Sequence, residues 1–296
     1  MRLDGIYPPI PTPFTADGEV ALDKLAANLD YWNKTGIAGY VVLGSNGEFV
    51  LLSEQEKLAV IAKVRERAAS GKFVLAGVGC EGTRETIKLA KKAAELGADA
   101  AVVITPCYYK GAMNAAALQY HYETIADASP IPVILYNMPA NTGVDMGADV
   151  VVKLAQHPNI VGLKDSSGNV VKIGDIVRQV PARFQVFAGS AGFLYPAMCL
   201  GGVGGVLALA NVAPNQCVDI FKLTREGRHE EARQLQLRMI PANTAVTAGF
   251  GIAGLKAALD MVGLYGGPVR GPLRPLDEQR TAALRRILQE AGVVAQ

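Results

Sequence analysis

The stretch NIVGLKDSSG, residues 159–168, joins a short apolar run to a lysine. The run 160–163 is too short for a helix and is typical of a buried parallel strand. A charged amine beside the core of a sheet costs free energy unless it is paired or neutral. A neutral lysine amine is a nucleophile that attacks carbonyl carbons. Lys164 is therefore either a Schiff-base lysine or a strand-end lysine that reaches solvent.

Similar short apolar runs recur along the chain and alternate with segments of helical periodicity. The predicted strands are 5–10, 39–43, 73–77, 100–104, 132–136, 160–164, 184–188 and 204–209. The predicted helices between them are 53–69, 83–96, 114–128, 148–156, 170–180, 191–200 and 213–225. A capping box of Ser53 with Glu56 opens the first of these helices.

This alternation predicts an α/β fold, a parallel (β/α)₈ TIM barrel. A doubly wound open sheet is the alternative, but it usually carries a glycine-rich turn after its first strand. Here that turn is PTPF, residues 11–14. We predict a catalytic barrel over residues 1–225 and a small helical C-terminal domain over residues 226–296. The second domain has predicted helices at 229–239, 254–262 and 281–290.

Composition narrows the functional classes. Half of the 296 residues are hydrophobic and the net charge is +2, without basic runs, so neither nucleic-acid nor membrane-surface binding is expected. Residues 184–218 are uncharged and long enough to span a bilayer, but their glycines and Pro196 indicate strand, buried helix, strand. The four cysteines form no C-x-x-C pair, and the N-terminus runs straight into a strand. Both features predict a cytoplasmic protein.

Barrel enzymes carry out their chemistry at the carboxyl ends of the strands. No histidine lies at a predicted strand end, which argues against a histidine-bound metal and a Ser-His-Asp triad. A carboxylate-only magnesium site from Glu48 and Asp165 remains an alternative. Cys80 and Cys107 are interpreted as buried apolar residues, because no histidine is placed to activate either thiol.

Two further features accompany Lys164. The loop Gly44-Ser45-Asn46-Gly47 can turn several N–H groups toward one point and bind a carboxylate. Tyr136 ends the strand beside that of Lys164, where a phenol either shuttles protons or caps the barrel mouth. An amine, phenols, hydroxyls and an anion loop together indicate Schiff-base chemistry on a small keto acid.

Several motifs resemble the dihydrodipicolinate synthase and N-acetylneuraminate lyase superfamily, from about residue 5 to residue 276. They are GSNGE at 44–48, YNMP at 136–139 and GLKDSSG at 162–168. Within it the chain looks most like the 4-hydroxy-2-oxoglutarate aldolases. That likeness rests on GSNGEF at 44–49, GCEGT at 79–83, TPCYYKG at 105–111, PANTG at 139–143, QHPNIVG at 156–162 and FAGSAGFL at 187–194.

The resemblance implies a homotetrameric class I lyase. Such an enzyme needs neither a metal nor a cofactor, because the imine on its lysine serves instead. By position, Lys164 resembles the Schiff-base lysine, Tyr136 the proton-shuttling tyrosine and Tyr108 a tyrosine that completes the neighbouring subunit's site. Ser45 and Asn46 match carboxylate-binding and relay positions, and Ser166 matches a substrate-binding serine. Further predicted substrate contacts are Gly47, Asn141, Gly189 and Ser190.

The chain departs from dihydrodipicolinate synthases at two places. Those enzymes usually have two threonines where this chain has Ser45-Asn46, and an arginine shortly after the strand-5 tyrosine. Here the stretch after Tyr136 offers Asn141 and no cation. We therefore predict cleavage of 4-hydroxy-2-oxoglutarate to pyruvate and glyoxylate. The alternatives are dihydrodipicolinate synthase, another pyruvate aldolase, or a binding relative that forms the imine without turnover.

Overall fold

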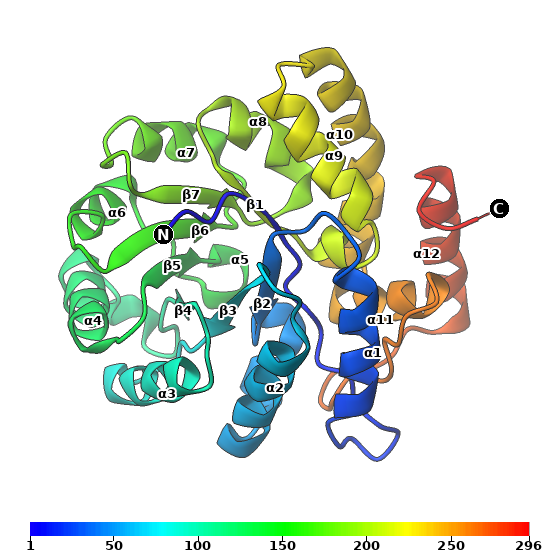
Figure 1. Cartoon of the computed structure of the whole chain (residues 1–296), viewed down its shortest axis with the longest axis horizontal. Helices are drawn as coiled ribbons and strands as arrows, with labels where there is room; N and C mark the ends of the chain where they lie inside the picture. Colours follow the sequence, from blue (N-terminus) through cyan, green and yellow to red (C-terminus); the bar gives the residue numbers. More distant parts are fainter. Residues whose placement is uncertain (296) are drawn as a thin grey trace.

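The computed structural model describes residues 1–295 and, within them, eight parallel strands in the order β1-β8-β7-β6-β5-β4-β3-β2. The strands are β1 (Gly5–Tyr7), β2 (Gly39–Val42), β3 (Phe73–Gly77), β4 (Ala100–Ile104), β5 (Val133–Asn137), β6 (Ile160–Asp165), β7 (Gln185–Ala188) and β8 (Gly204–Val206). The Ala38 N–H donates to Ile6 O at 2.8 Å and the Val41 N–H to Pro8 O at 3.0 Å, which joins the first strand to the second. The predicted barrel is confirmed, and the open-sheet alternative is wrong (Figure 1).

Helices surround the strands in Figure 1. The barrel helices are α1 (Leu22–Trp32), α2 (Glu54–Arg67), α3 (Thr83–Glu95), α4 (Ala115–Ala128), α5 (Pro139–Thr142), α6 (Ala148–Leu154), α7 (Val170–Val177), α8 (Leu194–Cys199) and α9 (Pro214–Arg225). The sequence prediction missed α1, which begins without a side-chain cap and places a polar Asn28 on its buried face. The predicted capping box of Ser53 and Glu56 is confirmed at the start of α2.

The uncharged segment 184–218 forms strand, helix, strand, as predicted. Strand β8 is shorter than expected, because the chain turns into a 3₁₀ helix at Ala208–Asn211. Among the described residues, no helix is both long and apolar enough to cross a bilayer.

Side chains fill the inside of the barrel below the carboxyl ends of the strands. Leu3, Tyr7, Val41 and Phe187 are buried there, and Tyr7 packs edge-on against Phe187 at 6.1 Å. A second, larger apolar layer separates the strands from the helices. The barrel interior is therefore a packed core rather than a channel, and an open site can exist only above it.

The last helices, α10 (His229–Thr244), α11 (Gly251–Met261) and α12 (Glu278–Glu290), gather on one side of the barrel, at the right of Figure 1. A π-helical turn at Ala245–Gly249 joins α10 to α11. Asn28 of α1 exchanges two hydrogen bonds with the backbone of Tyr265, at 2.8 and 2.9 Å. The predicted boundary near residue 225 falls between α9 and α10, and the division into two domains stays a prediction.

Candidate active site

Lys164 and Tyr136 are register partners on the adjacent strands β6 and β5. In parallel strands, residues in register point to the same face, so both side chains enter the barrel mouth. The Lys164 Nζ lies 3.8 Å from the centroid of the Tyr136 ring, and the two residues are 3% and 5% exposed. Lys164 therefore does not reach out to solvent, and the solvent-exposed alternative is wrong.

A cavity of about 400 Å³ opens above this pair. Residues on its wall that the sequence prediction named are Ser45, Asn46, Tyr136, Asn141, Lys164, Ser166, Gly189 and Ser190. Among the described residues that line it, Lys164 is the one charged side chain and none is a histidine. The Ser45 Oγ and the Tyr136 Oη are 3.2 Å apart, within hydrogen-bonding distance. The cavity thus combines a single amine with hydroxyl and amide groups.

The loop that carries Ser45 has a strained backbone at both ends. Within residues 1–295, Leu43 (φ 60°) and Glu48 (φ 55°) are the two non-glycine residues with positive φ. Such a conformation costs on the order of 1 kcal/mol at each residue and persists only when neighbouring contacts hold it. The predicted anion-binding loop has fewer free donors than expected. The N–H groups of Gly47 and Glu48 donate to Gly44 O and Ser45 O and are not free for a ligand. Within the predicted loop, the N–H groups of Gly44, Ser45 and Asn46 remain for a ligand.

Gly47 itself does not line the cavity of Lys164. Its carbonyl accepts a hydrogen bond of 2.7 Å from the Thr12 Oγ1, and a Cβ at this position would meet Ile10 O at 3.3 Å. Gly47 therefore allows the loop to approach the chain after β1 closely.

Asp165, the residue after Lys164, is fully buried in an ion-pair network below the cavity floor. The Lys172 Nζ lies 2.9 Å from Asp165 Oδ2 and 2.6 Å from Asp145 Oδ1. Asn137 donates from its Nδ2 to both carboxylates. Burial raises the pKa of Asp145, but the hydrogen bonds from Lys172 and Asn137 outweigh it and bring the net pKa below its ordinary value. This network fixes the end of β6 and so the direction of Lys164.

The loop after β7 lies very close to Ser166. The Gly189 N–H donates to Asp165 O at 2.7 Å, and a Cβ on Gly189 would collide with the Ser166 Oγ. Ser190 also faces the last helices, because the Asn243 Nδ2 donates to its Oγ at 3.0 Å. The C-terminal helices therefore help to place this wall of the cavity.

Tyr108 does not line the cavity of its own chain and is 78% exposed. Its ring packs edge-on against Tyr109 at 5.0 Å. The Glu81 carboxylate holds the loop, since it accepts the N–H groups of Cys107 at 3.0 Å and Tyr108 at 2.9 Å. Burial raises the pKa of Glu81, but these bonds outweigh it and leave the pKa below its ordinary value. The loop thus presents a fixed pair of tyrosine rings outward.

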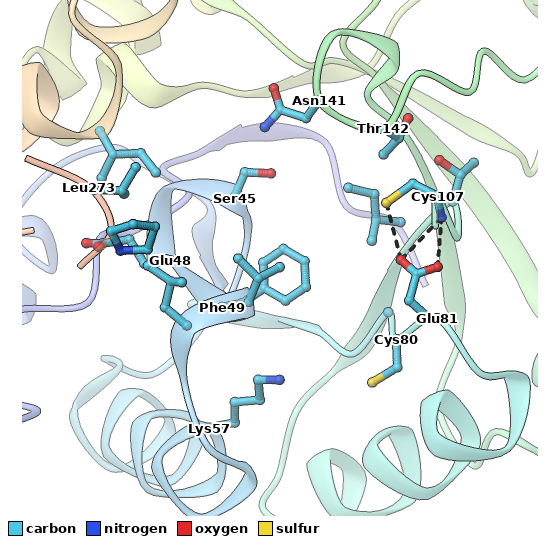
Figure 2. Close-up of a pocket in the computed structure, with 17 residues that line it drawn as sticks. Ser45, Glu48, Phe49, Lys57, Cys80, Glu81, Cys107, Asn141, Thr142 and Leu273 are labelled. Atoms are coloured by element: carbon cyan, nitrogen blue, oxygen red, sulfur yellow. Dashed lines mark hydrogen bonds between the residues drawn. The ribbon is translucent and has the colours of Figure 1, made fainter. Parts of the chain in front are cut away.

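A second cavity, of about 570 Å³, adjoins the first and shares Ser45 and Asn141 with it. Figure 2 shows both residues on its wall, with the Glu81 carboxylate bonded to Cys107 across from them. Cys80 and Cys107 line this cavity and are half-buried, so the prediction that both are buried is wrong. Burial raises the pKa of both thiols, and at Cys107 the Glu81 carboxylate raises it further. The neutral thiol is therefore the favoured form of each.

The carboxylates of the alternative magnesium site are each paired with a buried lysine. Asp165 contacts Lys172, and Glu48 contacts Lys256 at 2.5 Å. Removing one partner of such a buried pair costs about 3–5 kcal/mol, because it leaves an uncompensated charge. Both carboxylates are thus already neutralised by the protein's own ammonium groups, which disfavours a magnesium ion held by these two residues.

Sequence reasoning missed the contribution of the C-terminal helices to the cavity. Val246, Thr247, Ala248, Gly251 and Ile252 line it from the π-helical turn and the start of α11. π-Helical turns are rare and are frequent at functional sites. No local sequence pattern marks such a turn, because it differs from an α-helix by one inserted residue. Its discovery required the tertiary structure.

Comparison with known proteins identifies a family for the chain. The dihydrodipicolinate synthetase family matches residues 2–291. A probable mitochondrial 4-hydroxy-2-oxoglutarate aldolase of Emericella nidulans is 37% identical over 292 residues, covering 97% of this chain and 94% of the relative. A 4-hydroxy-tetrahydrodipicolinate synthase of Methanosphaerula palustris is 38% identical over 288 residues, covering 96% and 98%. Since these two identities are nearly equal, likeness alone does not choose the substrate.

Solved structures agree with the fold over the whole chain. The chloride-inhibited dihydrodipicolinate synthase of Acinetobacter baumannii, complexed with pyruvate, superposes with a TM-score of 0.94 at 33% identity. The match covers 99% of this chain and 100% of that one.

Proposed function

This chain belongs to the dihydrodipicolinate synthetase family, and we propose that within it the protein is a 4-hydroxy-2-oxoglutarate aldolase that releases pyruvate and glyoxylate. At the level of the family, it is a pyruvate-dependent carbon–carbon lyase that works through a Schiff base. The roles of individual residues, the aldehyde product and the assembly are proposals.

Lys164 is the proposed Schiff-base lysine. Its Nζ attacks the C2 carbonyl of the keto acid, water leaves, and an imine forms. The Tyr136 Oη then takes the proton of the C4 hydroxyl, the C3–C4 bond breaks, and its electron pair passes into the imine to give an enamine. Glyoxylate departs, C3 is protonated, and water hydrolyses the imine to return pyruvate and the free amine. Ser45, 3.2 Å from the Tyr136 Oη, carries the proton onward.

The observation that supports this substrate is the charge of the cavity wall. Among the described lining residues, Lys164 is the one basic residue and none is acidic, and Asn141 lies after β5 where dihydrodipicolinate synthases usually carry an arginine. A charge-assisted contact to a second carboxylate contributes on the order of 1.5–3 kcal/mol, and Asn141 supplies only a neutral donor. Asn46, Ser166 and the Gly189–Ser190 backbone are further neutral contacts that we assign to the substrate. Aspartate semialdehyde, which those synthases receive through the arginine, is therefore expected to react poorly. The C5 carboxylate of 4-hydroxy-2-oxoglutarate is assigned to these neutral donors.

A homotetramer is the proposed assembly, in which the exposed Tyr108 of each subunit completes the proton relay of a neighbour. A cytoplasmic location is also proposed. All four cysteines, which lie within the described part of the chain, are free, as expected for a reducing compartment.

The second candidate is 4-hydroxy-tetrahydrodipicolinate synthase, the name of the Methanosphaerula relative. Specificity constants separate the two candidates, measured for cleavage of 4-hydroxy-2-oxoglutarate and for condensation of pyruvate with aspartate semialdehyde. We expect the first to exceed the second by at least about tenfold, the equivalent of about 1.4 kcal/mol. A larger constant for aspartate semialdehyde would replace the proposal with the second candidate. Imine formation without either activity would favour a binding relative.

A further inference from the structure

A buried carboxylate ties the loop of Ser45 to the C-terminal helices. Glu48 follows the 3₁₀ turn Ser45–Gly47 and is 1% exposed. Its Oε1 lies 2.5 Å from the Nζ of Lys256 on α11, an ion pair rather than a well-aligned hydrogen bond. Its Oε2 accepts the N–H of Arg270 at 2.8 Å. Both partners lie in the C-terminal part of the chain, so the loop is attached to residues far away in sequence.

Lys256 is itself enclosed by partners. Its side chain is 1% exposed, its Nζ donates to Pro268 O at 2.8 Å, and it lies 4.3 Å from the centroid of the Phe14 ring. The Arg270 guanidinium also lies 4.3 Å from this centroid. Water cannot replace Glu48 at so buried an ammonium group without rearrangement. Loss of either partner therefore leaves a charge that the surroundings cannot compensate.

The loop that carries Ser45 has a strained backbone. Leu43 and Glu48, on either side of Ser45, both have positive φ. The Thr12 Oγ1 holds Gly47 O from the β1 side, and the Glu48 carboxylate holds the far end of the loop. The Ser45 Oγ lies between these anchors, at 3.2 Å from the Tyr136 Oη. A released Glu48 would let the backbone relax and move Ser45 relative to the phenol.

We propose that Glu48 and Lys256 are a pair of positioning residues through which the C-terminal helices hold Ser45 against Tyr136. Neither residue touches the substrate; the pair sets the rate of proton transfer by fixing the relay. The inference rests on the proposed function for the roles of Ser45 and Tyr136, and it does not depend on which aldehyde the enzyme handles.

The test measures exchange of the methyl protons of pyruvate in D₂O by ¹H NMR, with the purified full-length enzyme. Exchange needs imine formation, loss of a C3 proton to give the enamine, return of a deuteron and hydrolysis, and it needs no aldehyde. The variants are Lys256→Met, Glu48→Gln and the double variant. Leu284→Ala is the control, because Leu284 is fully buried in α12 and its truncation destabilises the same helices without touching Glu48.

We expect Lys256→Met and Glu48→Gln each to lower kcat for exchange by at least about tenfold, as loss of an aligned acid–base group does. The double variant, which buries no unpaired charge, should regain most of the lost melting temperature. Its kcat should stay low, because the attachment of the loop to α11 is still missing. Leu284→Ala should lower the melting temperature and leave kcat within about twofold. This pattern would separate positioning from general stability.

The proposal is overturned if the single variants melt earlier but keep the wild-type kcat, as the control does, or if the double variant regains the wild-type kcat. Glu48→Gln preserves the shape of the side chain. Its kcat therefore tests the positioning role even if Lys256→Met does not fold. A wild-type enzyme that exchanges pyruvate protons but does not cleave 4-hydroxy-2-oxoglutarate would contradict only the proposed substrate. A wild-type enzyme without exchange would overturn both.

Discussion

The Nζ of Lys164 lies over the ring of Tyr136, 3.8 Å from its centroid. The position follows from strand register, because the two residues are direct partners on β6 and β5. A phenol in this position is close to any carbon that the amine binds covalently. The same phenol contacts Ser45, so a path for protons leads from the imine to the loop after β2.

Replacement of Tyr136 by phenylalanine should separate imine formation from carbon–carbon cleavage. The ring would remain over Lys164, but the hydroxyl that takes the C4 proton would be lost. We expect kcat for 4-hydroxy-2-oxoglutarate to fall about 10²–10⁴-fold while pyruvate still forms an imine. Steady-state kinetics with Tyr120→Phe, an exposed tyrosine of α4, provide the control. A Tyr136→Phe enzyme with the wild-type kcat would show that Tyr136 takes no part in the proton relay.

Tyr108 should act in a neighbouring subunit. It is exposed in its own chain, so mixed oligomers of Tyr108→Phe and Lys164→Ala subunits should contain some sites with both residues intact. We expect activity to reappear on mixing two inactive variants, with subunit exchange verified by native mass spectrometry. Verified hybrids that stay inactive would contradict a shared site.

Acid should destabilise the protein through Glu56. Hydrogen bonds from Arg270 lower the pKa of Glu56 to about 2, from an ordinary value of 4.5. A carboxyl group whose pKa is lower in the folded than in the unfolded protein stabilises the folded state at pH values above its unfolded pKa. This stabilisation is lost as the pH falls from about 4.5 toward 2. The difference between the folded and unfolded pKa of Glu56 corresponds to about 3 kcal/mol of stability at most.

The measurement is the free energy of unfolding in urea between pH 5 and about pH 3, a range that includes the start of the loss near pH 4.5. The Glu56→Gln enzyme should be less stable at pH 5 and show a shallower loss toward low pH. Glu66→Gln, on the exposed face of the same helix, removes the same charge and should keep the wild-type slope. Identical slopes for Glu56→Gln and wild type would show that this pair does not carry the acid response.

Chelation should leave the activity unchanged. The two carboxylates that could have formed a magnesium site, Glu48 and Asp165, are paired with Lys256 and Lys172. We expect the retro-aldol rate after dialysis against EDTA to equal that of the untreated enzyme. Loss of the rate, with recovery on adding a divalent ion, would mean that an ion takes part in the reaction.

The sequence was sufficient to predict the barrel and the juxtaposition of Lys164 with Tyr136, because both depend on short-range patterns. Strand periodicity determines which face a residue occupies, and neighbouring strands of a parallel barrel bring those faces together. It was not sufficient for α1, whose start has no capping side chain. It also missed Lys256 as the partner of Glu48 and Thr247 on the cavity wall. Glu48 and Lys256 lie 208 positions apart in the sequence, and no local pattern encodes either of these features.

Reduction of the imine in place tests whether Lys164 is the Schiff-base lysine. Borohydride added together with pyruvate converts the imine to a stable secondary amine, which peptide mass spectrometry locates. We expect one pyruvate-derived adduct per chain on the peptide that contains Lys164, and none in Lys164→Ala. An adduct on another lysine, or trapping that persists in Lys164→Ala, would contradict it.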